Sequence, residues 1–142
     1  MTKADLHAFI ETQKYAVLST VTAERTPHSA LVGIAVTTDL EIVFDTVKTS
    51  RKYKNLTANP AAAFVVGCSG DATLQYEGLA VELTGGEELE RCKAAYFTKF
   101  PDGPTRESWP GICYFVLKPK WIRFSDYGET PAMIEEFRFE RD

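Results

Sequence analysis

Residues 72–84 read Ala-Thr-Leu-Gln-Tyr-Glu-Gly-Leu-Ala-Val-Glu-Leu-Thr, a segment long enough for one extended strand but with a fault in its alternation. Two apolar residues share one face of such a strand, Leu74 and Tyr76. Three later ones have the opposite parity: Leu79, Val81 and Leu83. A β-bulge at or near Gly78 would bring both sets to the same side. Because a bulge bends its strand, the segment predicts the corner of a barrel.

Other strand-like segments lie on both sides of this one and are joined by short turns. Before it, four runs are predicted as strands: Tyr15 to Thr22, His28 to Thr37, Leu40 to Thr46 and Ala61 to Gly67. After it, Lys118-Pro119-Lys120 separates two more: Ile112 to Leu117 and Trp121 to Tyr127. Helices are predicted over Asp5 to Gln13, Ser50 to Ala58 and Glu87 to Lys99. This pattern indicates a mainly β protein, a small antiparallel barrel or sandwich.

The composition is that of one globular domain, residues 1–142, with 44% hydrophobic and 25% charged residues. The net charge of -4 opposes affinity for nucleic acid or anionic membranes. No stretch approaches the ~20 apolar residues that cross a bilayer, and residues 1–9 carry charges where a signal peptide is apolar. We therefore expect a cytoplasmic protein without a nucleic-acid or membrane partner.

Motifs for nucleophilic or metal chemistry are absent from the sequence. The cysteines Cys68, Cys92 and Cys113 lie 24 and 21 residues apart and form no CxxC pair, which predicts reduced thiols and no metal site. The histidines His7 and His28 are isolated, and no HExxH, GxSxG or Walker motif occurs. The sequence therefore names no catalytic residue.

The segment Lys48-Thr49-Ser50-Arg51-Lys52-Tyr53-Lys54 carries four positive charges and no acid, which leaves -8 for the rest of the chain. If Thr49 or Ser50 caps the following helix, Arg51 and Lys52 occupy its first turn. Free backbone N–H groups and the positive end of the helix dipole already gather there. An exposed cation at that place is unfavourable by about 0.3–1 kcal/mol, and a bound phosphate would resolve the conflict.

Two other interpretations of this segment are a solvated basic turn and a site for an RNA phosphate. No stripe of basic and aromatic residues accompanies the cluster, so it can accommodate only one or two phosphates. A single phosphorylated small molecule is the favoured ligand.

The order of these residues resembles the pyridoxamine 5′-phosphate oxidase-like family of FMN-binding split barrels. The resemblance rests first on the run from Phe44 to Lys52, followed by Asn55-Leu56 and Asn59-Pro60. Further pieces follow in the same order: Glu77-Gly78, Tyr96-Phe97, and Pro119 with Ile122-Arg123-Phe124. The resemblance covers roughly Tyr15 to Tyr127. It implies an antiparallel split β-barrel of about six to seven strands, Greek-key-like.

The resemblance also implies an FMN-dependent oxidoreductase that uses a small-molecule substrate and an electron donor. In that family the FMN phosphate binds an arginine and a lysine, here Arg51 and Lys52. The other cofactor-binding residues that it implies are the hydroxyls of Thr46, Thr49 and Ser50, then Gln75 (or Thr73) near the flavin ring, and Trp121. FMN sites of the family lie between two subunits, which implies a homodimer with the cofactor at the interface.

The run from Ser29 to Ala35 carries neither the arginine nor the lysine that the family's oxidases place around it. The resemblance therefore implies the cofactor more strongly than pyridoxamine phosphate as the substrate. The alternative function is a non-catalytic module that holds a flavin, a deazaflavin or haem. Haem would need an axial ligand, for which His7, His28 and the cysteines are the candidates. The tail after Tyr127 reads either as an edge strand or as a dimer arm.

Overall fold

The structure is a computed structural model that describes residues 1–139. Its helices are α1 (Lys3–Glu11), α2 (Arg51–Ala58), α3 (Gly86–Lys99) and the short 3-10 helix η1 (Gly103–Arg106). Its strands are β1 (Tyr15–Val21), β2 (Pro27–Gly33), β3 (Ala35–Val36), β4 (Ile42–Val47), β5 (Ala61–Val66), β6 (Ala72–Leu83), β7 (Ile112–Asp126) and β8 (Met133–Arg138). None of these helices has the length and apolar character needed to span a membrane.

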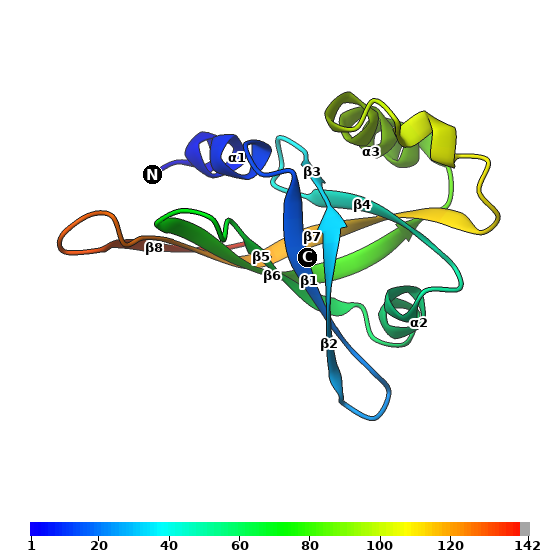
Figure 1. Cartoon of the computed structure of the whole chain (residues 1–142), viewed down its shortest axis with the longest axis horizontal. Coiled ribbons are helices and arrows are strands. Elements are labelled where there is room, and N and C mark those ends of the chain that lie inside the picture. The colour runs from blue at the N-terminus through cyan, green and yellow to red at the C-terminus, as the bar shows by residue number, and fades with distance from the viewer. Residues whose placement is uncertain (140–142) are drawn as a thin grey trace.

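All the strands belong to one curled antiparallel sheet (Figure 1). The strand order is β2-β1-β5-β6-β7-β4-β3, and β8 pairs with the second half of β7. Within the described residues, the end strands β2 and β3 are not paired with each other, so the barrel is split between them. The predicted antiparallel split barrel is therefore confirmed, and the described part of the tail after Tyr127 contains the edge strand β8.

The two longest strands, β6 and β7, carry the predicted irregularity. Their register shifts between Glu77, which faces Trp121, and Gly78, which faces Pro119. Lys120 is thus the extra residue, and the bulge lies in β7 opposite the predicted position.

This bulge explains a wrong prediction in β7. The segment Lys118-Pro119-Lys120 was expected to separate two strands, but β7 runs without a break through it. A proline lacks the N–H that a regular ladder needs, and a bulge is one of the few places in a strand where that loss is tolerated.

The prediction that the bulge gathers all apolar residues of β6 on one side is also wrong. Leu74 and Tyr76 face the interior of the curled sheet, whereas Leu83 packs on the opposite face beneath α3. Val81 is 40% exposed. Because the extra residue belongs to β7, side chains along β6 alternate between the two faces without a break. The later apolar residue Leu83 therefore lies on the face opposite Leu74 and Tyr76.

The expected strand from His28 to Thr37 is divided into β2 and β3. Ile34 lies between them, is fully buried, and donates its N–H to the carbonyl of Lys14, which extends the β1–β2 register by one more pair. Beyond Ile34 the chain turns, and β3 pairs with β4.

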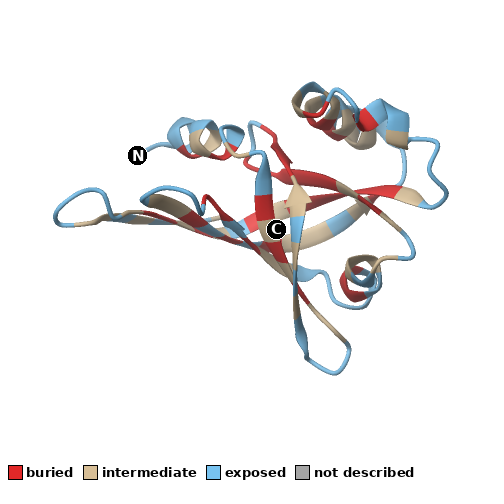
Figure 2. Cartoon of the chain, in the orientation of Figure 1, coloured by how far each residue is buried: buried red, intermediate tan, exposed pale blue. Residues whose placement is uncertain are grey.

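Two hydrophobic clusters lie on the two faces of the sheet (Figure 2). The larger one fills the inside of the curl and includes Leu6 and Ile10 from α1 and Leu56 from α2. The smaller one lies between α3 and the sheet, where Cys92 and Tyr96 pack with Val116. Each helix is thus held in place by its own apolar side chains.

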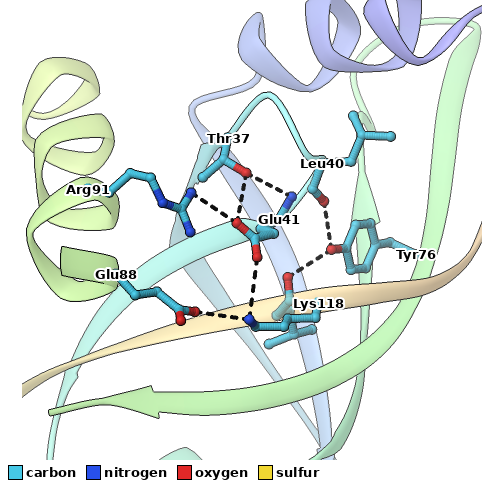
Figure 3. Close-up of polar contacts among 8 residues, drawn as sticks. Thr37, Leu40, Glu41, Tyr76, Glu88, Arg91 and Lys118 are labelled. Carbon is cyan, nitrogen blue, oxygen red and sulfur yellow. Dashed lines mark hydrogen bonds and ion pairs between the residues drawn. The ribbon is translucent and has the colours of Figure 1, made fainter. Parts of the chain in front are cut away.

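A charged cluster around Glu41 fastens α3 to the sheet (Figure 3). Glu41 is 8% exposed and accepts hydrogen bonds from the Thr37 hydroxyl and from Arg91 Nη1, both at 3.1 Å. Lys118 Nζ lies 3.7 Å from Glu41 and 3.0 Å from Glu88. Two acids and two cations balance here, so the cluster leaves no free charge for a ligand.

Candidate cofactor-binding site

The start of α2 is fixed to the end of β4 by two hydroxyls. The Ser50 hydroxyl oxygen accepts the backbone N–H of Tyr53 at 3.2 Å and so caps the helix. It also accepts the hydroxyl of the buried Thr46 at 2.9 Å. Thr49 is exposed in the turn between them. Of the two predicted caps, Ser50 is therefore the one used, and Thr46 positions it.

The first turn of α2 holds two cations and no acid. Arg51 is exposed and Lys52 is half-buried, and neither forms an ion pair with any residue from 1 to 139. By contrast, four other basic side chains each have a carboxylate oxygen within 4 Å: Arg91, Lys93, Arg106 and Lys118. The helix start therefore combines free N–H groups, the positive dipole end and two unneutralised side chains.

Two cavities lie on either side of Arg51. The first has a volume of about 200 Å³ and is lined by Leu18, Thr20, His28, Ser29, Ala30, Arg51 and Lys52. The second has a volume of about 220 Å³ and is lined by Thr22, Ala23, Glu24, His28, Arg51, Lys54, Asn55 and Ala58. In Figure 1, α2 lies beside the hairpin of β1 and β2 that supplies the facing walls. Arg51 thus lines both of these open cavities, and Lys52 lines the first.

Buried polar contacts position α2 against the sheet. One turn after Arg51, Asn55 is 5% exposed, and its Nδ2 donates to Thr20 Oγ1 at 3.0 Å and contacts His28 Nδ1 at 2.9 Å. On another side of the helix, the Tyr53 hydroxyl donates to Glu82 at 3.1 Å, and this hydrogen bond raises the pKa of Tyr53. These contacts fix the helix orientation and thereby the place of Arg51.

The sequence did not indicate the group of Thr20, His28 and Asn55. The three residues are brought together only by the β1–β2 pairing and by the docking of α2, across 27 and 35 positions of the chain. The spacing of Arg51 and Asn55 by four residues was the only local signal, since it places both on one face of a helix.

Gln75 and Trp121 lie away from these cavities, on the outward face of the sheet. Gln75 is exposed on β6, and the Trp121 Nε1–H donates to Glu136 at 2.8 Å. In the sheet order, β6 and β7 lie two and three places from β1, whose residues Leu18 and Thr20 line the first cavity. Within one chain, the structure brings Thr46, Thr49, Ser50, Arg51 and Lys52 together and leaves Gln75 and Trp121 apart from them.

The same outward face exposes several large apolar side chains. Leu31 is 66% exposed, Tyr15 50%, and Val65 and Ile134 42% each. Leu31, Val17, Val65 and Gln75 form one row across β2, β1, β5 and β6. This face is therefore apolar over β2, β1 and β5, carries the polar Gln75 on β6, and exposes Ile134 beyond β7 on β8.

A second charged group lies between β4 and α3. The Tyr96 hydroxyl donates to Asp45 at 3.1 Å, and Arg106 donates to Asp45 and to Asp102, both at 3.0 Å. Burial and the Asp45 carboxylate raise the pKa of Tyr96, which keeps its hydroxyl protonated and donating. Because two carboxylates neutralise Arg106, this group offers no unpaired cation to an anionic ligand.

Known structures share this fold. A heme binding protein from Mycobacterium smegmatis has a TM-score of 0.80 and 18% identity, over 97% of this chain and 58% of that chain. A heme storage protein from Vibrio cholerae has a TM-score of 0.73 and 16% identity, over 82% of this chain and 89% of that one. A pyridoxamine 5′-phosphate oxidase-related, FMN binding protein from Nostoc punctiforme has a TM-score of 0.67 and 13% identity, over 97% and 95%. These identities show the fold alone.

The chain thus spans less than two thirds of the length of the Mycobacterium smegmatis protein. A comparison with curated proteins finds no match. A family model described as pyridoxamine 5′-phosphate oxidase matches residues 2–126, which include α2, its two cavities and the whole bulged pair of β6 and β7. The chain therefore belongs to the pyridoxamine 5′-phosphate oxidase family.

Proposed function

We propose that this protein binds FMN through its phosphate at the start of α2 and acts as a flavin-dependent oxidoreductase on a small-molecule substrate. The observation that carries the proposal is the pair of cations Arg51 and Lys52, which face a cavity of about 200 Å³ without a carboxylate partner in residues 1–139. A phosphate supplies the missing negative charge. Bound FMN would supply the electron-transfer chemistry, and the chain would bind and orient it.

Each polar residue at the helix start has a distinct role in this proposal. The planar guanidinium of Arg51 can donate two parallel hydrogen bonds to phosphate oxygens, whereas Lys52 contributes a point charge. The Ser50 oxygen already accepts from Thr46 and Tyr53, so its own proton remains available to a phosphate oxygen. Thr46 acts through Ser50, and Thr49 supplies an exposed hydroxyl in the turn before the helix.

Haem binding is the second candidate, because two proteins of the same fold are named for it. His28 is the histidine that lines the cavities beside Arg51. A histidine that ligates a metal ordinarily donates its other ring N–H to an acceptor. His28 Nδ1 instead lies 2.9 Å from an amide donor, Asn55 Nδ2. With the Asn55 amide in this orientation, the ring proton lies on Nε2, the nitrogen that an iron would need, and this arrangement supports FMN over haem.

Titration of the purified chain with FMN, riboflavin and hemin tests the proposal. Riboflavin is the matched control because it lacks only the phosphate. We expect FMN to bind at least tenfold more tightly than riboflavin, since at least one charge-assisted hydrogen bond is gained. Equal affinity for the two flavins, or tight binding of hemin with no binding of FMN, would contradict the proposal.

We also propose that the outward face joins two copies in a homodimer and that the cofactor lies at their boundary. Soluble monomers rarely expose a contiguous apolar patch of the kind that Tyr15, Leu31 and Val65 form. Gln75 and Trp121 lie on this same face, so its burial in a dimer would place them where the family resemblance expects the flavin ring. Their separation from Arg51 within one chain agrees with a site that needs two.

Leu31→Glu is expected to convert this dimer to a monomer. In a twofold interface the substitution occurs twice, and burial of two carboxylates without partners raises the dissociation constant by about a hundredfold or more. Sedimentation at several protein concentrations measures the mass of the species. Tyr127→Glu is the matched control, because Tyr127 is 61% exposed in the turn before β8. A monomeric wild type, or an unaffected Leu31→Glu dimer, would refute this interface.

A further inference from the structure

We propose that His28 is a third anion-binding group of the α2 site, which in its neutral form donates Nε2–H to a phosphoryl oxygen in the cavity that it shares with Arg51 and Lys52. The identity of the ligand as FMN rests on the proposed function. The arrangement of His28, Arg51 and Lys52 is independent of that function, since all three side chains line the cavity of about 200 Å³.

The Asn55 amide determines which ring nitrogen of His28 carries the proton. Asn55 Nδ2 donates one hydrogen to Thr20 Oγ1 at 3.0 Å and lies 2.9 Å from His28 Nδ1. In this orientation of the amide, Asn55 Nδ2 donates and His28 Nδ1 accepts. The neutral ring therefore carries its proton on Nε2.

The partners that fix the ring are themselves immobilised. Asn55 is 5% exposed and Thr20 is 6% exposed, and they belong to α2 and β1 respectively. A ring flip would place a carbon against the amide and so cost the hydrogen bond of a buried group. His28 is thus held in one ring orientation, and with Asn55 Nδ2 facing Nδ1 its proton lies on Nε2.

The remaining ring nitrogen of His28, Nε2, makes no hydrogen bond to any residue in the described part of the chain. The charged groups that line the same cavities are Arg51, Lys52, Lys54 and Glu24, so three of the four are cations. A fixed N–H donor beside unneutralised cations is the arrangement that a bound oxyanion requires.

The tautomer can be measured in the unmodified protein. The chain has only two histidines, so nitrogen-15 labelling of histidine gives two rings, and a His7→Gln variant assigns them. We expect His28 to show the Nε2–H tautomer and its Nε2 resonance to shift, in a saturable way, as inorganic phosphate is added. The His7 ring, which lies on α1 near Glu11, should not respond. A proton on Nδ1, or no shift with phosphate, would overturn the proposal.

Affinity measurements give an independent test. His28→Leu removes the donor and is expected to weaken FMN binding about ten- to hundredfold, the effect of one hydrogen bond to a charged group, with riboflavin binding unchanged. His28→Gln keeps an N–H donor and should recover part of the loss, and His7→Leu is the control. Wild-type affinity in His28→Leu would overturn the proposal. If that variant does not fold, the phosphate titration decides.

The two proposals fail in different ways. A wild-type chain that binds FMN and riboflavin equally, while phosphate still shifts His28, contradicts the proposed FMN function and supports the anion site. A chain that prefers FMN through Arg51 and Lys52, with His28 unresponsive, supports the function and contradicts the role of His28.

Discussion

The double substitution of Arg51 and Lys52 by alanine is expected to lower the affinity for FMN by about a hundredfold or more and to leave the affinity for riboflavin unchanged. A hydrogen bond to a charged group contributes about 1.5–3 kcal/mol, and 1.4 kcal/mol is a factor of ten. Arg51 is exposed and Lys52 half-buried, so the lower end of this range applies to each. Fluorescence titration of both flavins at one fixed ionic strength measures the effect.

Two further variants sharpen this experiment. Arg51→Lys keeps the charge but loses the planar fork, so we expect an intermediate affinity. Lys3→Ala removes a cation on α1, where its side chain lies over the Phe139 ring, and should not change FMN binding. An equal loss for riboflavin and FMN would show that the two cations do not act on the phosphate. Unchanged FMN affinity would refute the site.

Gly78→Ala is expected to destabilise the protein by about 3 kcal/mol, the upper part of the range for overpacked sites. A Cβ at Gly78 would clash with the carbonyl oxygen of Lys118 and would lie 3.1 Å from its carbonyl carbon. These are backbone atoms of the bulged strand, so they cannot move aside as a flexible side chain would. Relief of the clash must open the register between β6 and β7.

Urea unfolding of Gly78→Ala and Gly70→Ala, followed by one spectroscopic signal, measures this difference. Gly70 is the matched control because an added Cβ there meets no atom within 4 Å. Its replacement should change the unfolding free energy by less than about 1 kcal/mol, and in the stabilising direction if only the unfolded chain is affected. Equal stability of the two variants would show that the bulge tolerates a side chain.

The fold was predictable where its signals are local. The fault in alternation around Gly78 correctly predicted an irregularity, and the hydroxyls before Arg51 correctly predicted a helix cap. A pattern within β6 cannot show which of two paired strands carries the extra residue. For that reason, only the observed strand pairing shows that β7 continues through Pro119 and that β6 places apolar residues on both faces of the sheet.

The candidate site likewise has a part that the sequence predicts and a part that only the folded chain brings together. Ser50, Arg51 and Lys52 are neighbours in the chain, so their combined chemistry is visible in the sequence. His28 looked like an isolated histidine, because its contact with Asn55 depends on the docking of α2 against β2. In the proposed dimer, the relation of the cations to Gln75 and Trp121 would depend on a second copy of the chain, which a local sequence pattern does not encode.

The most direct test of the central claim, FMN binding, is the absorption spectrum of the protein as purified, with mass measurement of the ligand released on denaturation. We predict a flavin spectrum and a released mass equal to that of FMN, in stoichiometric amount with the chain. A haem spectrum, or a colourless protein that gains no flavin absorbance after FMN is added and excess removed, would contradict it.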